Sequence, residues 1–374
     1  MERIIIVGGG FSGLLLASRI PDSEVFEENP EIGLPPHCTG IVSRDTIGII
    51  GSPARESIVS SYEYIRVLNS EGKDLVMLKP DQRIYKLDRI LLERLLAKEA
   101  GDRGSKIYTK ARVISIDLEG RAIVNEKGGL RRVEGSLIAL AEGSLGTMSR
   151  KFGLSRKHDL FLGVQGYIAI KGVHESEILV FIDDRIFRGF FAWLVPIDGR
   201  EALVGVATDL KSDAQRSIKL FLARLRKLGY LRDDILRRIY GGLIIRSYPL
   251  ARHYRGRVIS IGDAAGFVKP FSGGGIYPAS RQAESLSISL RKSRWEDHEG
   301  YLKRYLEIIR KEIGSLKNQW IATKVLERIG IEKAIKVLGD LGVRTILLDY
   351  DHHENTIAKT AKKILRLKDD REKS

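Results

Sequence analysis

The chain has 374 residues, of which 43% are hydrophobic and 30% are charged, a composition typical of a folded globular protein rather than a disordered one. Its formal net charge is +15, but the basic residues are mixed with 48 acidic residues along the whole chain, which argues against nucleic acid as a partner. No apolar run approaches the roughly 20 residues of a membrane-spanning helix. The single cysteine, Cys38, excludes an internal disulfide.

The first residues lead directly into an apolar segment. We therefore expect no signal peptide and a cytoplasmic location, with peripheral contact to an anionic membrane surface as a further use of the positive charge. The chain contains only five Asn and five Gln residues but many Ile, Arg, Lys and Glu residues, a bias typical of thermophile proteins.

The N-terminal segment predicts a nucleotide site. A predicted buried strand over residues 3–7 leads into G-x-G-x-x-G at Gly8, Gly10 and Gly13, and an apolar helix follows. In this motif the first glycine permits a tight turn, the second lets a pyrophosphate approach, and the third packs the helix on the strand. The next predicted strand ends in Glu27, which can accept a hydrogen bond from a ribose hydroxyl. Strand, turn, helix and terminal acid together are a specific signal of nucleotide binding.

Residues 29–41 contain three prolines and two glycines, which exclude a regular element and indicate a shaped loop. Loops of this kind often contact ligands. His37 and Cys38 lie in it and are candidates for such contact. A surface histidine and a small buried cysteine are the alternatives.

The middle of the chain predicts helices and strands in alternation, followed by a run of strands. We expect a strand pair over 60–80 and an amphipathic helix over 86–100, with Ile90, Leu91, Leu95, Leu96 and Ala100 on its apolar face. Strands are expected over 106–117 and 135–141, and further strands over 162–170, 178–182, 190–196 and 202–208. A helix is expected over 212–228, and residues 241–248 return the chain toward the next predicted strand. From 295 to about 367 we expect mostly helix, with breaks near Gly314, Gly330 and residues 339–342.

A second glycine-rich turn lies in the C-terminal third. A predicted strand over 258–261 ends in Gly262-Asp263, and a glycine triplet at 273–275 precedes a predicted helix from Ile276. An acid at the end of a strand can accept from a sugar hydroxyl, and the triplet lets backbone N–H groups approach a flat or anionic ligand at a helix N-terminus. A plain Gly-Asp turn is the alternative.

Together these motifs resemble the FAD-dependent oxidoreductases of the p-hydroxybenzoate hydroxylase fold, with Arg89 and Ala141-Glu142-Gly143 as further matches. Three stretches are similar to the geranylgeranyl reductase branch of that group. They are G-L-P-P-H-C at 33–38, F-A-W-L-V-P at 191–196, and G-D-A-A-G through G-G-G-I at 262–276. The resemblance covers about residues 1–310. Phe191, Val195 and Glu142 stand where the family usually has Tyr, Phe and Asp, which leaves the exact substrate open.

The resemblance implies site residues. It implies FAD as cofactor, bound by Gly8, Gly10, Gly13, Glu27, Cys38, Arg89, Val113, Gly262, Asp263, Gly273, Gly274, Gly275 and Ile276. It implies substrate contacts from His37, Phe191, Trp193 and Pro196, with Cys38 and Trp193 as candidate catalytic residues, and no metal. The alternatives are a surface helix arginine for Arg89 and plain core packing for Phe191 and Trp193.

The resemblance also implies an α/β (α+β) fold with a discontinuous Rossmann-like FAD-binding domain, an inserted antiparallel-sheet substrate domain and a helical C-terminal region. The expected boundaries are 1–59, 81–154 and 247–294 for the first, 60–80 and 155–246 for the second, and 295–374 for the third. An antiparallel sheet inserted in an α/β domain is a common way to cover a cofactor.

The activity implied is saturation of C=C bonds in geranylgeranyl chains, on archaeal ether lipid precursors, by hydride transfer from reduced flavin. The external reductant stays open among NAD(P)H, ferredoxin and a deazaflavin. One alternative is a monooxygenase of the same fold acting on an apolar aromatic or quinone substrate. A halogenase is disfavoured because Trp193 alone does not supply its W-x-W-x-I-P box. A non-catalytic flavin-binding or membrane-docking protein is the remaining alternative.

Overall fold

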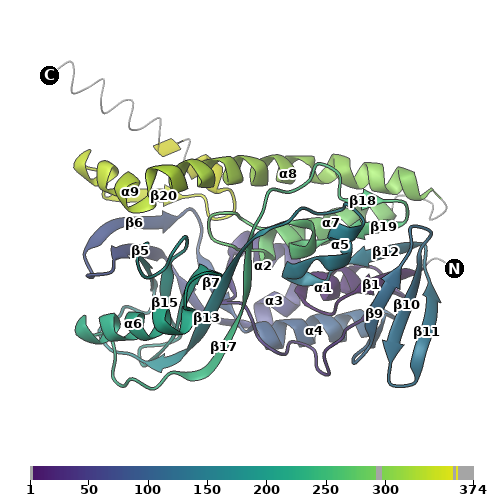
Figure 1. Ribbon diagram of the computed structural model, residues 1–374, viewed down its shortest axis with the longest axis horizontal. Helices are drawn as coiled ribbons and strands as arrows, with labels where there is room; N and C mark the ends of the chain where they lie inside the picture. The colour runs from purple at the N-terminus through teal and green to yellow at the C-terminus, as the bar shows by residue number, and fades with distance from the viewer. Residues whose placement is uncertain (1–2, 292–296, 357–358, 361–374) are drawn as a thin grey trace, which may run out of the picture.

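The computed structural model describes residues 3–291, 297–356 and 359–360 (Figure 1). Within these ranges, no helix is both long enough and apolar enough to cross a bilayer. The remaining residues, including 295–296 and 361–374 of the region expected to be helical, lie outside the described structure.

A six-stranded sheet forms the first layer, in the order β18-β19-β12-β1-β2-β8, parallel except for β18. Its strands are β1 (Ile4–Val7), β2 (Glu24–Phe26), β8 (Lys106–Tyr108), β12 (Leu137–Leu140), β18 (Tyr254–Arg255) and β19 (Val258–Ser260). All residues of β1, β12 and β19 are buried. Strands covered on both faces read as continuous apolar runs, which is why the sequence predicts them so clearly.

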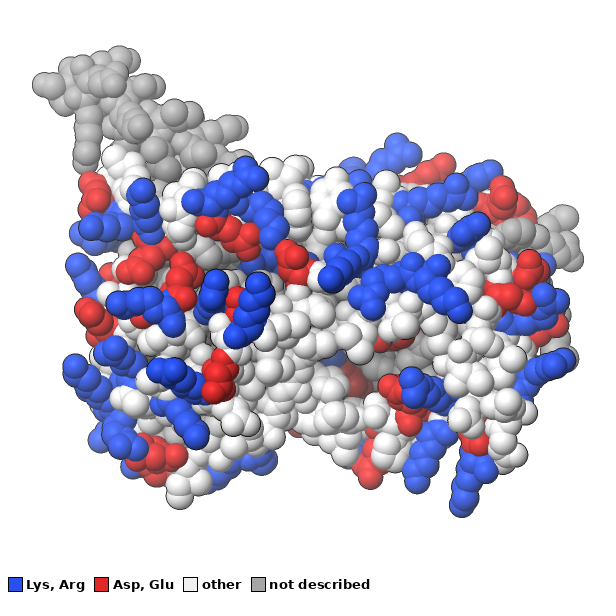
Figure 2. All heavy atoms as spheres, in the orientation of Figure 1, with Lys and Arg blue, Asp and Glu red and all other residues white. Residues whose placement is uncertain are grey.

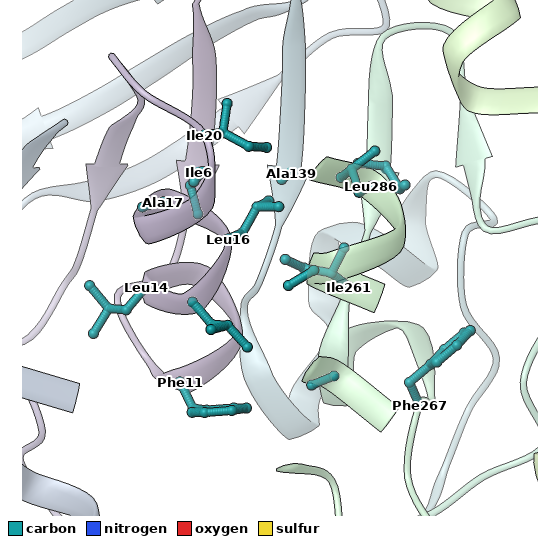
Figure 3. Close-up of a cluster of buried hydrophobic side chains, with 14 of the residues drawn as sticks. Ile6, Phe11, Leu14, Leu16, Ala17, Ile20, Ala139, Ile261, Phe267 and Leu286 are labelled. Carbon is teal, nitrogen blue, oxygen red and sulfur yellow. The ribbon is translucent and has the colours of Figure 1, made fainter. Parts of the chain in front are cut away.

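Alternate side chains of these strands enter two different cores, because successive residues of a strand point to opposite faces. On one face lie α1 (Phe11–Arg19), α4 (Arg89–Asp102), α7 (Ile276–Arg291) and α8 (His298–Ile329). Figure 3 shows Ile6, Leu16 and Leu286 meeting in this core. On the other face, Ile5 and Val7 pack against a small sheet of β9 (Arg112–Ile116), β10 (Arg121–Glu126) and β11 (Gly129–Glu134).

An eight-stranded, mainly antiparallel sheet forms the second layer, in the order β17-β13-β16-β15-β14-β5-β6-β20. Its strands are β5 (Tyr64–Asn69), β6 (Asp74–Pro80), β13 (Asp159–Ala169), β14 (Glu177–Ile182), β15 (Ala192–Pro196), β16 (Glu201–Asp209), β17 (Arg237–Arg246) and β20 (Thr345–Leu348). Helix α6 (Ala214–Lys227) covers one face through Ile218, Phe221 and Leu225.

The remaining elements are shorter. They are β3 (Ile41–Ser43), α2 (Arg44–Ile50), α3 (Ser52–Glu56), β4 (Ile58–Tyr62), β7 (Ile84–Leu87), α5 (Thr147–Lys151), two 3₁₀ turns (Gly143–Leu145 and Gly262–Ala265) and α9 (Ile331–Asp340). Strands β3, β7 and β4 form a three-stranded sheet of their own. The expected fold class, α/β with an inserted antiparallel sheet, is confirmed.

The predicted helix over 86–100 is shifted. Residues 84–87 form β7, and the helix begins at Arg89 because the Asp88 carboxylate accepts from the N–H groups of Ile90 and Leu91, both at 3.0 Å. Such a side-chain cap satisfies backbone donors at a helix start. Leu91, expected on the apolar face, is 41% exposed, whereas Leu92 is fully buried. Leu96 and Ala100 are fully buried as predicted, so the prediction misplaced only the start of the apolar face.

The C-terminal prediction is wrong in two places. Helix α8 continues through Gly314, where a helical glycine costs only about 1 kcal/mol relative to alanine, too little to break a helix that is packed along α7. Residues 345–348, expected to be helical, form β20 at the edge of the eight-stranded sheet, paired with β6. The breaks at Gly330 and near Gly342 are confirmed. The domain boundaries remain a prediction.

Strands β10 and β11 were not predicted. They form a hairpin whose turn contains Lys127 and Gly128. In β10 the buried Ala122 and Val124 alternate with less buried residues, whereas no residue of β11 is buried. The alternation is a strand signal, but the many arginine and glutamate residues obscure it.

We expect the two halves of α8 to contribute unequally to stability. Leu302 is fully buried among the residues that join α8 to α7, whereas Ile321 is 53% exposed. Leu302→Ala should lower the free energy of unfolding by about 2–5 kcal/mol because it leaves a cavity, and Ile321→Ala should change it by less than about 0.5 kcal/mol. Urea denaturation of both variants measures the difference, and equal losses would contradict this account of the helix.

Candidate functional site

The turn after β1 contains glycines with different roles. Gly8 has φ of +104°, and a Cβ there would collide with the Ala141 carbonyl at the end of β12, while a Cβ on Gly13 would collide with the Gly8 carbonyl. These two glycines are required by the packing of strand, turn and helix. A Cβ on Gly10 meets no atom within 4 Å, so the protein's own packing does not explain its small size. Gly10 lies on the wall of a large cavity, where its missing side chain leaves room for a ligand.

Glu27 connects the end of β2 to this turn. One carboxylate oxygen accepts from the Gly9 N–H at 2.6 Å, and the other accepts from the Asn29 N–H and side-chain amide, both at 2.7 Å. Glu27 is 8% exposed and lines the same cavity. Its carboxylate is therefore held in a fixed position beside the glycine turn.

The second glycine turn lies beside the first, because a Cβ on Gly262 would collide with the Ser12 side chain, and it lines the same cavity. The Gly262 N–H donates to the Gln282 side chain at 2.7 Å, which fixes the turn to α7. Asp263, the glycine triplet 273–275 and Ile276 at the start of α7 all line the cavity. The structure records no hydrogen bond from the described residues to the Asp263 carboxylate. Burial raises its pKa to about 6, and Arg89 opposes the shift.

Arg89 lies between the two turns. It forms an ion pair with Glu93, and its guanidinium lies 5.3 Å from the centroid of the Phe11 ring. Burial lowers the pKa of Arg89, but Glu93 and Cys38 outweigh burial and raise it above its ordinary value. Its Nε is buried and finds no acceptor among the described residues. The guanidinium of Arg89 is thus paired with Glu93, but its Nε–H still lacks an acceptor. A buried N–H group of this kind at a cavity wall is suited to an anionic or hydroxyl-bearing ligand.

The cavity has a volume of about 860 Å³ and continues from the two turns into an apolar arm. One wall of the arm comes from β5, β6 and β14 through Ile65, Val67, Val76, Leu78, Ile178, Val180 and Ile182. Strand β20, paired with β6 in the same sheet, extends this wall through Ile346 and Leu348. The facing wall comes from α8 and α9 through Leu326, Ile329, Ile331, Ala334, Ile335, Val337 and Leu338. The C-terminal segment, to which the sequence assigned no role, thus forms half of the arm.

The loop expected to contact a ligand lines the junction of the cavity. His37 is exposed and Cys38 is half-buried, and both line the cavity. Gln165, 3% exposed on β13, holds this loop: it donates to the His37 carbonyl at 3.4 Å and accepts from the Thr39 hydroxyl at 3.0 Å. The same Gln165 oxygen accepts from Trp193 Nε1 at 3.3 Å.

Gln165 was missed by the sequence reasoning. The available signal is an amide in the middle of the otherwise apolar strand 160–168, because buried polar side chains need partners.

The structure brings most of the predicted site residues to one cavity. Those on its wall are Gly10, Glu27, His37, Cys38, Arg89, Phe191, Trp193, Asp263, Gly273, Gly274, Gly275 and Ile276; those absent from it are Gly8, Gly13, Val113, Pro196 and Gly262. Val113, on β9, is buried between the three-stranded sheet and the six-stranded sheet. The Pro196 carbonyl accepts from the Tyr62 hydroxyl at 2.6 Å at the end of β15. Gly8, Gly13 and Gly262 act through backbone packing.

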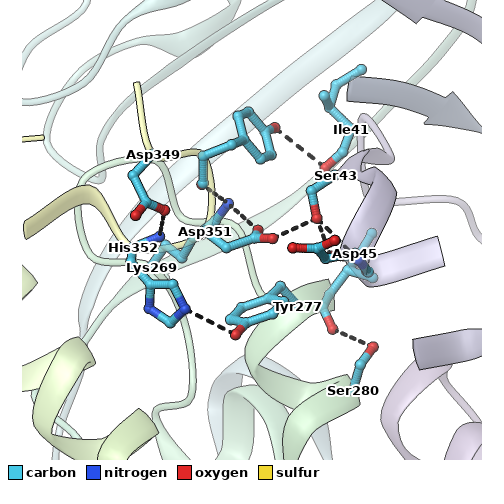
Figure 4. A network of polar contacts seen from close by, with 12 residues as sticks. Ile41, Ser43, Asp45, Lys269, Tyr277, Ser280, Asp349, Asp351 and His352 are labelled. Carbon is cyan, nitrogen blue, oxygen red and sulfur yellow. Dashed lines mark hydrogen bonds and ion pairs between the residues drawn. The ribbon is translucent and has the colours of Figure 1, made fainter. Parts of the chain in front are cut away.

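A second cluster missed by the sequence reasoning lies beside the glycine triplet (Figure 4). Lys269 is 5% exposed, donates to the Tyr350 carbonyl at 2.8 Å, and lies 3.4 Å from the Asp351 carboxylate. Burial lowers the pKa of Lys269, and Asp351 opposes the shift. Burial, with Lys269 nearby, lowers the pKa of His353 to about 3. Lys269, Tyr350 and His353 line the cavity, so this cluster places a buried cation and a neutral imidazole on its wall.

Glu142 stands where the family usually has aspartate, and its carboxylate has a structural role. Its carboxylate accepts from the N–H groups of Met148 and Ser149 at 2.9 and 2.6 Å. It therefore caps the start of α5.

The residues present fit a flavin nucleotide. Gly10 leaves open space at the N-terminal end of α1, Asp263 offers a carboxylate without a recorded partner, and Arg89 has a buried Nε without an acceptor. Hydroxyls and phosphates satisfy groups of these kinds.

Two glycine variants should separate ligand binding from folding. Gly10→Val should leave the melting temperature of the apoprotein within a few degrees, because open space surrounds the position, but it should weaken flavin binding by at least about tenfold. Gly13→Val should destabilise the fold itself, because its side chain meets the Gly8 carbonyl. Flavin titration and thermal melting distinguish the two. If Gly10→Val binds flavin as wild type does, the turn does not face the cofactor.

Asp263 should make the apoprotein less stable as pH rises. The folded pKa of about 6 exceeds the ordinary value of 3.8, so the folded state holds the proton more tightly and stability falls between about pH 4 and pH 6. Asp263→Asn removes this loss. The variant should be about 1–3 kcal/mol more stable than wild type at pH 8 and equal to it near pH 3.5. Urea unfolding at both pH values measures this, and a difference independent of pH would contradict it.

Comparison with known proteins supports the motifs. No family model matches the chain. Digeranylgeranylglycerophospholipid reductase 2 of Methanothermobacter thermautotrophicus is 28% identical over 358 residues, 90% of this chain and 91% of that protein. The crystal structure of a geranylgeranyl bacteriochlorophyll reductase-like protein from Thermoplasma acidophilum superposes with a TM-score of 0.82 at 18% identity, over 98% of this chain and 100% of that one.

The same fold occurs in other flavin enzymes. A probable FAD-dependent monooxygenase from Pseudomonas aeruginosa superposes with a TM-score of 0.65 at 15% identity, over 88% of this chain and 99% of that one. The fold therefore does not by itself distinguish reductase from monooxygenase. By sequence and by fold, the resemblance of this chain to the geranylgeranyl reductases among the flavin-dependent oxidoreductases is confirmed.

Proposed function

We propose that this protein is an FAD-dependent reductase that saturates the C=C bonds of geranylgeranyl chains on archaeal membrane lipid precursors. The observation that carries the proposal is the single cavity that joins two glycine turns, built for a nucleotide, to a long arm lined by aliphatic and aromatic side chains. The reductase names of the archaeal relatives support it.

The nucleotide end would hold FAD. The N-terminal end of α1 and the open Gly10 would receive the pyrophosphate, the fixed Glu27 carboxylate would accept from the adenosine ribose, and Asp263 would accept from the ribityl chain. Reduced flavin would supply the hydride for the alkene. The N-terminal end of α7 would place positive potential at the glycine triplet, which favours a ligand with negative charge there. The buried Lys269 lies beside Gly274, and its charge is paired with that of Asp351.

The apolar arm would bind and orient the prenyl chain. An isolated alkene has no carbonyl group for the protein to polarise, so catalysis depends on positioning and on the exclusion of water. The hydrogen bonds of Gln165 to the loop and to Trp193 fix two sides of the junction at which the arm meets the nucleotide end. Phe191, stacked on Phe190 with ring centroids 4.5 Å apart, keeps an aromatic wall without the hydroxyl of a tyrosine.

A monooxygenase acting on an apolar aromatic or quinone substrate is the second candidate function. The probable monooxygenase shares the fold, but the fold alone does not favour one activity over the other. The arm argues against it, because an arm that extends between β5, β6 and the C-terminal helices exceeds the needs of a single aromatic ring.

The proposal is tested by the masses of the products. The purified protein, reduced chemically by dithionite in the absence of oxygen, is mixed with a geranylgeranylated glycerophospholipid in detergent. We expect products heavier by whole multiples of two hydrogens. Incorporation of oxygen from air on an aromatic substrate would favour the monooxygenase, and an unchanged lipid mass with a flavin-loaded, reduced protein would contradict the proposal.

Val180→Trp provides a matched test of the arm. Val180 lies on β14 and lines the arm, so an indole there should lower the rate on the geranylgeranyl lipid by at least about tenfold while a ten-carbon prenyl substrate is affected less. Leu220→Trp is the control, because Leu220 is 42% exposed on α6. Equal effects of Val180→Trp on the two chain lengths would show that the arm does not hold the chain.

A further inference from the structure

One corner of the molecule exposes more apolar surface than folding requires. Ile321, Val325 and Ile329 follow one another at four-residue spacing on α8 and are 53%, 49% and 50% exposed. Residues four apart lie on the same helix face. Val337 on α9 and Leu347 on β20 are 51% and 55% exposed. We call these five residues, together with Arg328, Lys333, Lys336 and Arg344, the corner face; α9, β20 and the end of α8 lie together in Figure 1.

The apolar arm reaches this corner. Ile329 and Val337 line the cavity and are also about half exposed. Their neighbours Leu326, Ala334 and Leu338 line it as well. Residues shared by the wall of the arm and the outer surface mark its mouth, at the junction of α8 and α9.

Basic residues surround the mouth. Residues 328–347 contain four basic side chains, Arg328, Lys333, Lys336 and Arg344, against two acids, Glu332 and Asp340. Among the described residues, none of the four basic side chains has a recorded ion pair, so their charges are available to a partner. Figure 2 shows Lys and Arg side chains along the α8 edge of the molecule, with uncharged surface and some acidic side chains between them.

We propose that the corner face rests on an anionic lipid bilayer and that the prenyl chain enters the arm there without crossing water. The basic side chains would pair with anionic headgroups, and the exposed aliphatic side chains would enter the boundary between headgroups and acyl chains. A second copy of the chain fits less well, since two such faces carry like charge. The route of the substrate rests on the proposed function, whereas the binding of the face to lipid does not.

The test is sedimentation of the flavin-loaded protein with vesicles. One set contains only phosphatidylcholine, and the other contains one part phosphatidylglycerol to about two parts phosphatidylcholine. Two double variants alter the face without touching the cavity wall: Lys333→Glu with Lys336→Glu, and Ile321→Gln with Val325→Gln. The matched control is Lys127→Glu, Leu130→Gln and Arg132→Glu on the β10–β11 hairpin, where Leu130 is 69% exposed.

We expect wild type to bind the anionic vesicles more tightly than the neutral ones, and to be released by about 0.5 M salt. The charge variant should bind the anionic vesicles about tenfold or more weakly, the apolar variant should bind both kinds more weakly, and the hairpin control should bind as wild type does. Each variant should keep the wild-type melting temperature and the wild-type rate on detergent-dispersed lipid.

Three outcomes would overturn the proposal. Both corner variants could bind the vesicles as wild type does, or the hairpin control could lose as much binding as they do. Wild type could also be a dimer, with both corner variants monomeric. The last would assign the face to a second copy. Failure to reduce a prenyl lipid in detergent would instead refute the proposed function, and the vesicle measurement would still decide whether the face binds lipid.

Discussion

The position of β12 between β1 and β19 is the constraint on which the site depends. The three strands are parallel, so their carboxyl ends meet at the same edge of the sheet. The turns that follow β1 and β19 are separated by about 250 residues of sequence but by a single strand in space. The close contact of Gly8 with the end of β12 sets the first turn against that edge, and ligands of open α/β sheets bind at such edges.

The second layer extends the cavity beside the glycine turns into a long apolar arm. Strands β5 and β6 come from one segment and β13 to β17 from another, and β14 pairs with β5 to join them. The C-terminal helices then close the arm from the opposite side. None of these segments could enclose the arm alone, because each contributes one wall.

Buried polar contacts fix the relative positions of segments that are far apart in the sequence. Gln165 ties the 29–41 loop and Trp193 to β13, and Lys269 ties the loop before the glycine triplet to Tyr350 and Asp351 near the end of the described chain. Polar groups of this kind are stable inside a protein only when they are paired. Both sets of contacts bring a distant segment to the cavity wall. They therefore position the residues of the wall as well as stabilise the fold.

The sequence by itself determined the features that local chemistry dictates. The apolar strands, the two glycine turns, the terminal acid Glu27 and the antiparallel insertion were predictable, because continuous apolar runs, small residues at turns and alternation are read from neighbouring residues. The full list of site residues came from the family resemblance that these motifs carry, and most of those residues line the cavity. The tertiary structure alone decided that Gln165, Lys269 and His353 lie on the cavity wall, that residues 345–348 form an edge strand, and that α8 and α9 enclose the arm. These features depend on contacts between segments far apart in the chain, and no local pattern records which distant surface a side chain will meet.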